Sequence, residues 1–170
     1  ISGAALDTVT ITGAGAVDLD AAALAATVGT VNASAASGAV SIDLGNYATD
    51  DAAASGVDLA DITVTGGSGN DSLDVDGAAA TLELSVNAGA GDDTVVIGAD
   101  GITASSATQA GDVLVGGDGT DILSVTDAAA QAQGAVTTVS QFEELTISDA
   151  SSTGGVVVTN YQAGLNVVNL

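Results

Sequence analysis

Three short stretches of the sequence share one pattern: GGSGND at residues 66–71, AGAGDD at residues 88–93 and GGDGTD at residues 116–121. Each has glycine at its second and fourth positions, ends in aspartate and leads directly into an apolar segment. Glycine adopts backbone conformations that other residues avoid. A glycine turn that recurs before successive apolar segments therefore predicts a regular β-structure with the same turn in successive layers.

Short segments rich in β-branched residues recur along the chain, and several alternate apolar with polar side chains, which predicts strands. These segments cover residues 7–12, 40–44, 61–65, 72–76, 81–86, 93–97, 112–115, 121–126, 135–140, 145–148, 155–159 and 165–170. From residue 61 the first strands advance in steps of roughly eleven residues, and the glycine turn returns at every second strand. The period predicts an all-β fold, a parallel β-solenoid or β-roll with two strands on opposite faces of each coil.

The loops complete this predicted coil. We expect the three glycine turns to stack on one side and variable turns at 76–81, 99–111 and 127–134 to lie on the other. Alanine-rich stretches at 20–28 and 127–133 have good helix propensity but are too short for stable helices. They predict single helical turns within the loops.

The length of 170 residues suits one domain with a continuous core. Strand spacing is less regular over residues 1–60 than over residues 61–170, but no linker separates the two parts. We therefore expect one continuous domain that begins with looser solenoid coils. Only 2% of the residues are aromatic against 46% apolar, so thin layers of Val, Leu, Ile and Ala are the expected core.

The chain carries a net charge of −22 and contains no Lys, Arg or His. No carboxylate can form a salt bridge with a side chain of the same chain, so compensation must come from solvent ions or bound metal. The charge excludes nucleic acid as a partner, and no segment is apolar enough to predict membrane insertion. Without His, Lys or Cys, no serine or thiol can act as an activated nucleophile, and we expect no enzymatic activity.

Stacking of the glycine turns would bring Asp71, Asp93 and Asp121 into line about 4.8 Å apart. At an effective dielectric near 20, neighbouring carboxylates at this distance repel by roughly 3 kcal/mol. A cation between consecutive turns would convert this repulsion into attraction. Oxygen ligands without nitrogen or sulfur favour Ca²⁺; Mg²⁺ fits a flexible carbonyl cage less well, and Zn²⁺ lacks its usual ligands.

We therefore predict a calcium site with at least two ions, in which Asp71, Asp93 and Asp121 are the main ligands and the middle turn faces two ions. The other residues expected to supply oxygens or to shape the turns are Gly66, Gly67, Ser68, Gly69, Asn70, Gly89, Ala90, Gly91, Asp92, Gly117, Asp118 and Gly119. Whether Asn70, Asp92 and Asp118 bind the ion or orient its ligands stays open at this point. The remaining acids, Glu143 among them, are interpreted as solvated surface charge.

The three stretches also fit the nonapeptide G-G-x-G-x-D-x-U-x, where U is a large apolar residue, over residues 66–74, 88–96 and 116–124. Only Ala88 departs from it. In this the chain resembles the repeats-in-toxin (RTX) family of secreted bacterial proteins, which implies a right-handed parallel β-roll with calcium in its turns. The chain lacks the usual run of tandem copies spaced by nine residues, which implies fewer ions.

Stretches at 9–24, 30–46 and 141–148 look like segments of crystalline surface-layer proteins of Gram-negative bacteria that carry such repeats. The resemblance implies a structural segment that leaves the cell by type I secretion, then folds and assembles at the cell surface when extracellular Ca²⁺ binds. Its partners would be further copies in a two-dimensional lattice and, through other parts of the full protein, a cell-surface polysaccharide. Two alternatives stay open: a calcium-dependent adhesin or matrix-binding module, and the accessory β-roll of a secreted enzyme.

Overall fold

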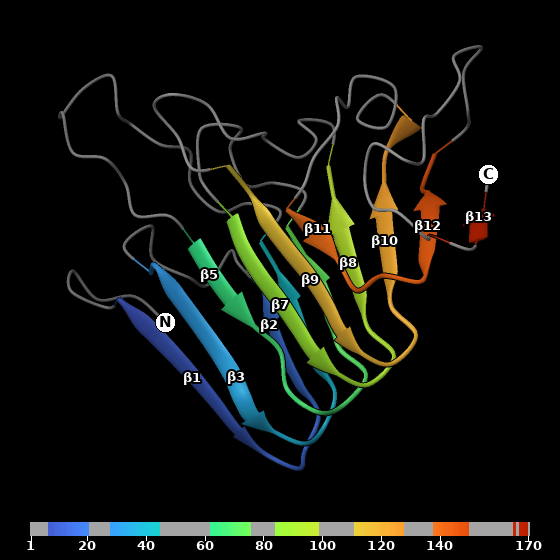
Figure 1. Cartoon of the computed structure of the whole chain (residues 1–170). Coiled ribbons are helices and arrows are strands. Elements are labelled where there is room, and N and C mark those ends of the chain that lie inside the picture. Colours follow the sequence, from blue (N-terminus) through green and yellow to red (C-terminus); the bar gives the residue numbers. More distant parts are fainter. Residues whose placement is uncertain are drawn as a thin grey trace, which may run out of the picture.

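A computed structural model describes seven parts of the chain: residues 7–20, 28–44, 62–75, 84–98, 111–127, 138–149, and 165 with 167–169. Within them the chain forms two sheets of parallel strands (Figure 1). The first sheet contains, in spatial order, β1 (Thr8–Gly13), β3 (Thr30–Ala36), β5 (Ile62–Thr65), β7 (Leu84–Ala90), β9 (Val113–Asp118) and β11 (Val139–Ser140). The second sheet contains β2 (Val17–Asp20), β4 (Val40–Asp43), β6 (Ser72–Asp74), β8 (Thr94–Ile97), β10 (Ile122–Val125), β12 (Glu144–Ile147) and β13 (Val167–Asn169).

The chain alternates between the two sheets, so that each coil contributes one strand to the first sheet and the next strand to the second. Every strand pairs in parallel with the corresponding strand of the neighbouring coil. The tight turns that join the two strands of each coil lie together along the lower edge of the structure in Figure 1. This arrangement confirms the predicted all-β class with two strands in each coil, each of which pairs in parallel with the corresponding strand of the next coil.

The core lies between the sheets and is built from columns of equivalent residues. One column on the inner side of the first sheet consists of Val31, Val64, Val86, Leu114 and Val139. Its counterpart in the second sheet consists of Ile42, Leu73, Val95, Leu123 and Leu145. All ten are buried, and their alternation with outward-facing polar residues is the period that the sequence displays.

Two strands, β2 and β3, were not predicted from the sequence. Val17–Asp20 is only four residues long, and Thr30–Ala36 is rich in Ala, Ser and Asn, which have weak strand propensity. Pairing with neighbouring coils on the stack stabilises both strands. The predicted strand at 155–159, the helical turns at 20–28 and 127–133, and the loops at 76–81, 99–111 and 127–134 lie wholly or mostly outside the described residues.

The second and third glycine stretches begin as strand, because β7 continues to Ala90 and β9 to Asp118. Gly89 pairs with Gly117, and both have positive φ angles, 112° and 127°. A Cβ atom at Gly117 would overlap with the carbonyl oxygen of Gly89 on the neighbouring coil. Glycine at this position is therefore required by the close approach of successive turns as well as by the backbone conformation.

We expect Gly117→Ala to lower the free energy of unfolding by about 2 kcal/mol or more, because it adds both a steric overlap and an unfavourable φ angle. Gly15→Ala is the matched control: Gly15 also lies in a tight turn, but a Cβ atom there has no neighbour within 4 Å. Thermal or denaturant unfolding of both variants measures the difference. Equal stability of the two variants would show that the turns do not approach as closely as described.

Candidate metal centre

Strand register places the three predicted aspartates in one column. Ser72 pairs with Thr94 and Thr94 with Ile122, so the residues directly before them, Asp71, Asp93 and Asp121, occupy equivalent positions on consecutive coils. All three side chains are buried, with exposed fractions of 3%, 1% and 0%. The predicted alignment of the three carboxylates is confirmed, and they are more deeply buried than surface turns require.

Hydrogen bonds join this column into a carboxylate ladder. The backbone N–H of Asp71 donates to Asp93 Oδ1 at 2.8 Å, and the N–H of Asp93 donates to Asp121 Oδ1 at 2.9 Å. At one end the N–H of Val40 donates to Asp71 Oδ1 at 2.8 Å, and at the other the N–H of Asp121 donates to Glu143 Oε2 at 2.8 Å. Each carboxylate therefore accepts a hydrogen bond from the preceding coil.

A second ladder runs beside the first in the opposite sense. Asn70 Oδ1 accepts the N–H of Asp92 at 3.0 Å, and Asp92 Oδ1 accepts the N–H of Thr120 at 3.0 Å. Here the side chain of one coil accepts from the following coil. The exposed Asn70 and Asp92 side chains thus join neighbouring turns through hydrogen bonds. From the sequence alone, it was open whether these residues bind the ion or orient its ligands.

The two oxygens of each aspartate are not equally satisfied. Asp71 Oδ2 accepts the N–H of Gly67 in its own turn at 2.6 Å, so both carboxylate oxygens of Asp71 accept a hydrogen bond. Asp93 Oδ2 and Asp121 Oδ2 are buried and accept no hydrogen bond. Gly89 and Gly117, which correspond to Gly67 in these two turns, have positive φ angles. The three turns that look alike in sequence therefore differ at the oxygen that faces into the turn.

The pKa of Asp93 is raised from 3.8 to about 6, mainly by burial and in smaller part by the nearby charges of Asp71, Asp121 and Asp92, while the hydrogen bond from Asp71 N–H lowers it. Burial also raises the pKa of Asp121, and Glu143 is the first of the carboxylates that add to the rise. Both shifts have the same main cause, which is that burial removes water from a charged carboxylate.

The remaining predicted residues shape the turns. A Cβ atom at Gly66 would overlap with the carbonyl oxygen of Ala88, and one at Gly91 with the carbonyl oxygen of Gly69. Several carbonyl oxygens of the turns accept hydrogen bonds from backbone N–H groups. For example, the N–H of Ala90 donates to the carbonyl oxygen of Gly67 at 3.0 Å. In these turns carbonyl oxygens thus point along the stack, from one coil toward the next.

Two further turn residues remain outside the ladders. Ser68 donates its backbone N–H to the Ala36 carbonyl at 3.0 Å, and the Asp118 carbonyl accepts the N–H of Gly91 at 2.9 Å. The Asp118 and Gly119 positions are exposed. Of the residues predicted to supply side-chain oxygens, Asp93 and Asp121 are those with a buried oxygen that accepts no hydrogen bond.

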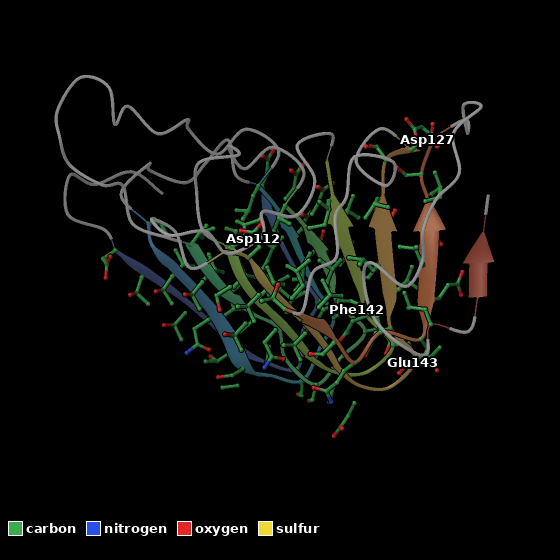
Figure 2. The ribbon with its side chains drawn as sticks, turned by 45° about the horizontal axis from the view of Figure 1, so that its top comes forward. Asp112, Asp127, Phe142 and Glu143 are labelled. Carbon is green, nitrogen blue, oxygen red and sulfur yellow. The ribbon has the colours of Figure 1, made fainter. Side chains whose placement is uncertain are left out.

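The interpretation of Glu143 as solvated charge is wrong. The register of β10 and β12 places Glu143 after Asp121 in the column, where it is half-buried and accepts the Asp121 N–H. Counted between paired residues, the turn between β11 and β12 is shorter than the turn between β9 and β10, and it has Gln141 and Phe142 in place of glycines. Gln141 has a φ of 58°, and Phe142 is buried. Figure 2 shows both Phe142 and Glu143 at this end of the stack. Glu143 takes the place of an aspartate in the ladder, and its longer side chain reaches the N–H of Asp121. The spacing of the glycines does not reveal this residue.

Acidic residues are also buried at the ends of the strands away from the tight turns. Asp112 precedes β9, and its Oδ1 accepts the N–H of Leu84 at 2.8 Å; Asp127 follows β10 and donates its N–H to Asp149 Oδ1 at 2.5 Å. Figure 2 shows Asp112 and Asp127 on this side of the molecule. The same device, a carboxylate that accepts the N–H of an adjacent coil, therefore occurs at both edges of the sheets.

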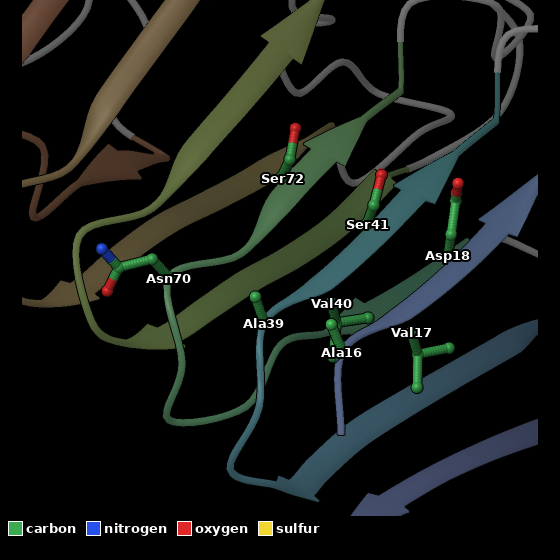
Figure 3. Close-up of a pocket in the computed structure, with 8 residues that line it drawn as sticks. All are labelled: Ala16, Val17, Asp18, Ala39, Val40, Ser41, Asn70 and Ser72. Carbon is green, nitrogen blue, oxygen red and sulfur yellow. The ribbon is translucent and has the colours of Figure 1, made fainter. Parts of the chain in front are cut away.

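A hollow of about 320 Å³ lies beside the first turns, on the outer side of the second sheet (Figure 3). Its lining consists of Ala16, Val17, Asp18, Ala39, Val40, Ser41, Asn70 and Ser72. Small alanines at 16 and 39 leave space next to the larger Asn70 of the following coil. The lining holds a single ionisable side chain, that of Asp18.

Within the described ranges, no three or more acidic side chains are arranged as a ready metal site. A cation at the ladder would have to combine one or two carboxylates with backbone carbonyls.

Comparison with protein-family models, curated proteins and solved structures finds no match to this chain. No helix in the described part of the chain is long and apolar enough to cross a membrane.

The raised pKa of Asp93 predicts a pH effect in metal-free protein. The folded state binds the proton more tightly than the unfolded state, so its contribution to stability is complete below the ordinary pKa of 3.8 and is lost as pH rises through about 6. We expect chelator-treated protein to have more β-structure near pH 4 than near pH 7, measured by far-UV circular dichroism, because protonation removes the buried charge of Asp93.

The isosteric Asp93→Asn variant cannot ionise and should show a clearly smaller decrease over the same pH range. Asp18→Asn, which changes an exposed carboxylate on the second sheet, is the control for the general loss of negative charge and should keep the wild-type slope. Identical pH profiles for Asp93→Asn and the wild type would contradict the assignment of the effect to Asp93.

Proposed function

We propose that the chain is a calcium-binding β-roll whose folding depends on the bound cation. The observation that carries the proposal is the pair of oxygens Asp93 Oδ2 and Asp121 Oδ2, which are buried and accept no hydrogen bond in a chain without a cationic side chain. A buried carboxylate without a partner is strongly unfavourable. Either a proton or a metal ion has to compensate it.

A proton is the weaker candidate at neutral pH. The pKa of Asp93 is about 6, so the carboxyl group is mostly ionised at pH 7 even in the folded state. Protonation also leaves the neighbouring carboxylates without compensation. A divalent cation serves two carboxylates at once, which matches the spacing of one acid per coil.

Calcium fits the available donors best. The ladder offers carboxylate oxygens and is surrounded by glycine carbonyls that point along the stack, and Ca²⁺ accepts six to eight such oxygens in flexible geometry. Mg²⁺ requires near-octahedral geometry and retains its waters. We assign the two expected ions to the turns of Asp93 and Asp121, whereas Asp71, whose oxygens accept the N–H groups of Val40 and Gly67, acts as a hydrogen-bond acceptor.

The biological role that we propose is a structural one, in an RTX-like, right-handed β-roll of a secreted bacterial surface-layer protein. The three G-x-G-x-D turns and the two-sheet coil support it. A cation-dependent ladder suits export, because the carboxylate column would oppose folding where Ca²⁺ is scarce and permit it outside the cell. Type I secretion, extracellular location and lattice assembly belong to this proposal.

The first experiment is a calcium titration of chelator-treated protein followed by far-UV circular dichroism. We expect a cooperative increase in β-structure with Ca²⁺ and little response to Mg²⁺ at the same ionic strength, because metal binding contributes folding free energy. Full β-structure in chelator at pH 7, unchanged by Ca²⁺, would overturn the proposal.

Isosteric variants test the assignment of the ions. In Asp93→Asn and Asp121→Asn the ladder can persist, since Oδ1 still accepts its hydrogen bond, but the charge that attracts the ion is lost. We expect at least a tenfold loss of calcium affinity, and stability in chelator equal to or above that of the wild type. Isothermal titration calorimetry and thermal unfolding measure the two quantities.

Asp71→Asn is the matched control on the same ladder. Its new amide group would face the N–H of Gly67, and a buried donor would be left unsatisfied at a cost of about 1–3 kcal/mol. We expect lower stability both with and without calcium, and a calcium affinity of the folded protein close to that of the wild type. A loss of affinity as large as that of Asp93→Asn would place an ion at Asp71 and contradict the assignment.

A further inference from the structure

The charges of the described strands are divided unequally between the two sheets. On the outer side of the second sheet, acids alternate with buried apolar residues: Asp18, Asp20, Asp43, Asp74 and Glu144. In the strands of the first sheet the single acid is Asp118, at the end of β9 where the turn begins. Just before β1, the exposed Asp7 accepts the hydroxyl group of Thr8 on its Oδ2 at 3.5 Å. Apart from this edge, the described outer side of the first sheet is uncharged in a chain with a net charge of −22, and we call it the uncharged face.

Columns of hydroxyl and amide groups cover this uncharged face. Register aligns one such column along β1, β3, β5 and β7, and it consists of Thr8, Thr30, Thr63 and Ser85. The column two positions further along the strands consists of Thr10, Asn32, Thr65 and Asn87. All eight are exposed or half-buried, and parallel pairing spaces them about 4.8 Å apart, which makes the face regular along the stack.

The first column ends in an apolar residue. Val113 pairs with Ser85, and with 41% of its surface exposed it is the most exposed large apolar side chain among the described residues. Val115, two positions on, is half-buried on the same side. The uncharged face of β1, β3, β5, β7 and β9 therefore combines polar groups that form hydrogen bonds with an apolar patch at one end.

We propose that this uncharged face is the surface through which copies of the chain associate with each other. Two polyanionic chains repel wherever their acids meet, and no cationic side chain exists to offset this. The first-sheet face is where two copies can approach without bringing carboxylates together. Its hydroxyl and amide groups are both donors and acceptors, so the face is complementary to itself.

The size of the face determines the kind of association. Five strands about 4.8 Å apart, each presenting several residues at about 3.3 Å, give an area on the order of 400 Å² per partner. A standard stable interface buries about 800 Å² per partner. A contact of this size is weak, and a self-complementary face joins copies in pairs. The face therefore suits one weak contact of the proposed lattice, whose other contacts lie elsewhere on the chain, in preference to an isolated, long-lived dimer.

The inference extends the proposed lattice role, and two matched variants test it. Ser85→Glu places one acid in the middle of the uncharged face, and Ser72→Glu places the same acid on the outer side of the second sheet. Both serines are exposed strand residues, so the two changes differ chiefly in the face that they alter. Circular dichroism in calcium reports folding, and sedimentation velocity up to about 1 mM protein reports association, because weak contacts have dissociation constants in this range.

We expect the folded wild type to associate reversibly, Ser85→Glu to weaken association at least tenfold, and Ser72→Glu to leave it unchanged. If Ser72→Glu is the more disruptive, or if both are equal, the copies meet through the acidic face with calcium bridges and the inference is wrong. A wild type that stays monomeric while its first-sheet face retains a neutral polysaccharide would also overturn it. Because folding is read separately, a missing calcium response rejects the proposed function without deciding the surface.

If either glutamate variant fails to fold, Ser85→Asn and Ser72→Asn provide neutral replacements that probe the same two positions. Asparagine already occupies the first-sheet face at Asn32 and Asn87, so Ser85→Asn should fold and keep its association. Addition of salt supplies an independent measurement. Contacts through an uncharged face should strengthen or stay constant as salt screens the repulsion between copies, while loss of association with salt would indicate charged contacts and contradict the proposal.

Discussion

The structure depends on a column of buried carboxylates in a chain that cannot neutralise them. Asp71, Asp93, Asp121 and Glu143 follow one another on consecutive coils, and each accepts a backbone N–H from the coil before it. These hydrogen bonds stabilise the ionised form, while burial and mutual repulsion disfavour it. For Asp93 burial prevails, as its pKa of about 6 indicates. The ladder joins the coils and at the same time makes their stacking sensitive to protons and cations.

Glycine makes this column possible because it allows the turns to approach closely. Where Gly89 and Gly117 pair, the carbonyl of one coil lies at the position that a Cβ atom of the next would occupy. The turns also differ in their hydrogen bonds: Gly67 donates its N–H to Asp71, whereas Asp93 and Asp121 each have a buried oxygen that accepts no hydrogen bond. The turn of Asp71 is thus complete through hydrogen bonds, whereas the turns of Asp93 and Asp121 are not.

The sequence predicted the parallel two-strand coil and the alignment of the aspartates, because both follow from a period that local residues display. It did not reveal Thr30–Ala36 as a strand, since small polar residues have weak strand propensity and stack pairing supplies the stability. It also missed Glu143, where a shortened turn removes the glycine pattern while register preserves the position. The unequal hydrogen bonding of the three aspartates accompanies a difference in backbone conformation at Gly67, Gly89 and Gly117, which nearly identical motifs do not reveal.

The direction of the ladder also determines how the coils depend on one another. Since each carboxylate accepts from the preceding coil, no turn satisfies its aspartate alone, and stability arises at the junctions between coils. The ladder begins at Val40, which donates its N–H but has no carboxylate, and the N-terminal coils beyond it carry alanine at positions 16 and 39 beside the turns. Cation dependence should therefore be concentrated in the coils of β7 to β10, where the unsatisfied oxygens lie, while β1 to β4 depend on sheet pairing and the apolar core. One continuous stack thus contains a cation-independent part and a cation-dependent part, and the second can order only against a neighbour that is already folded.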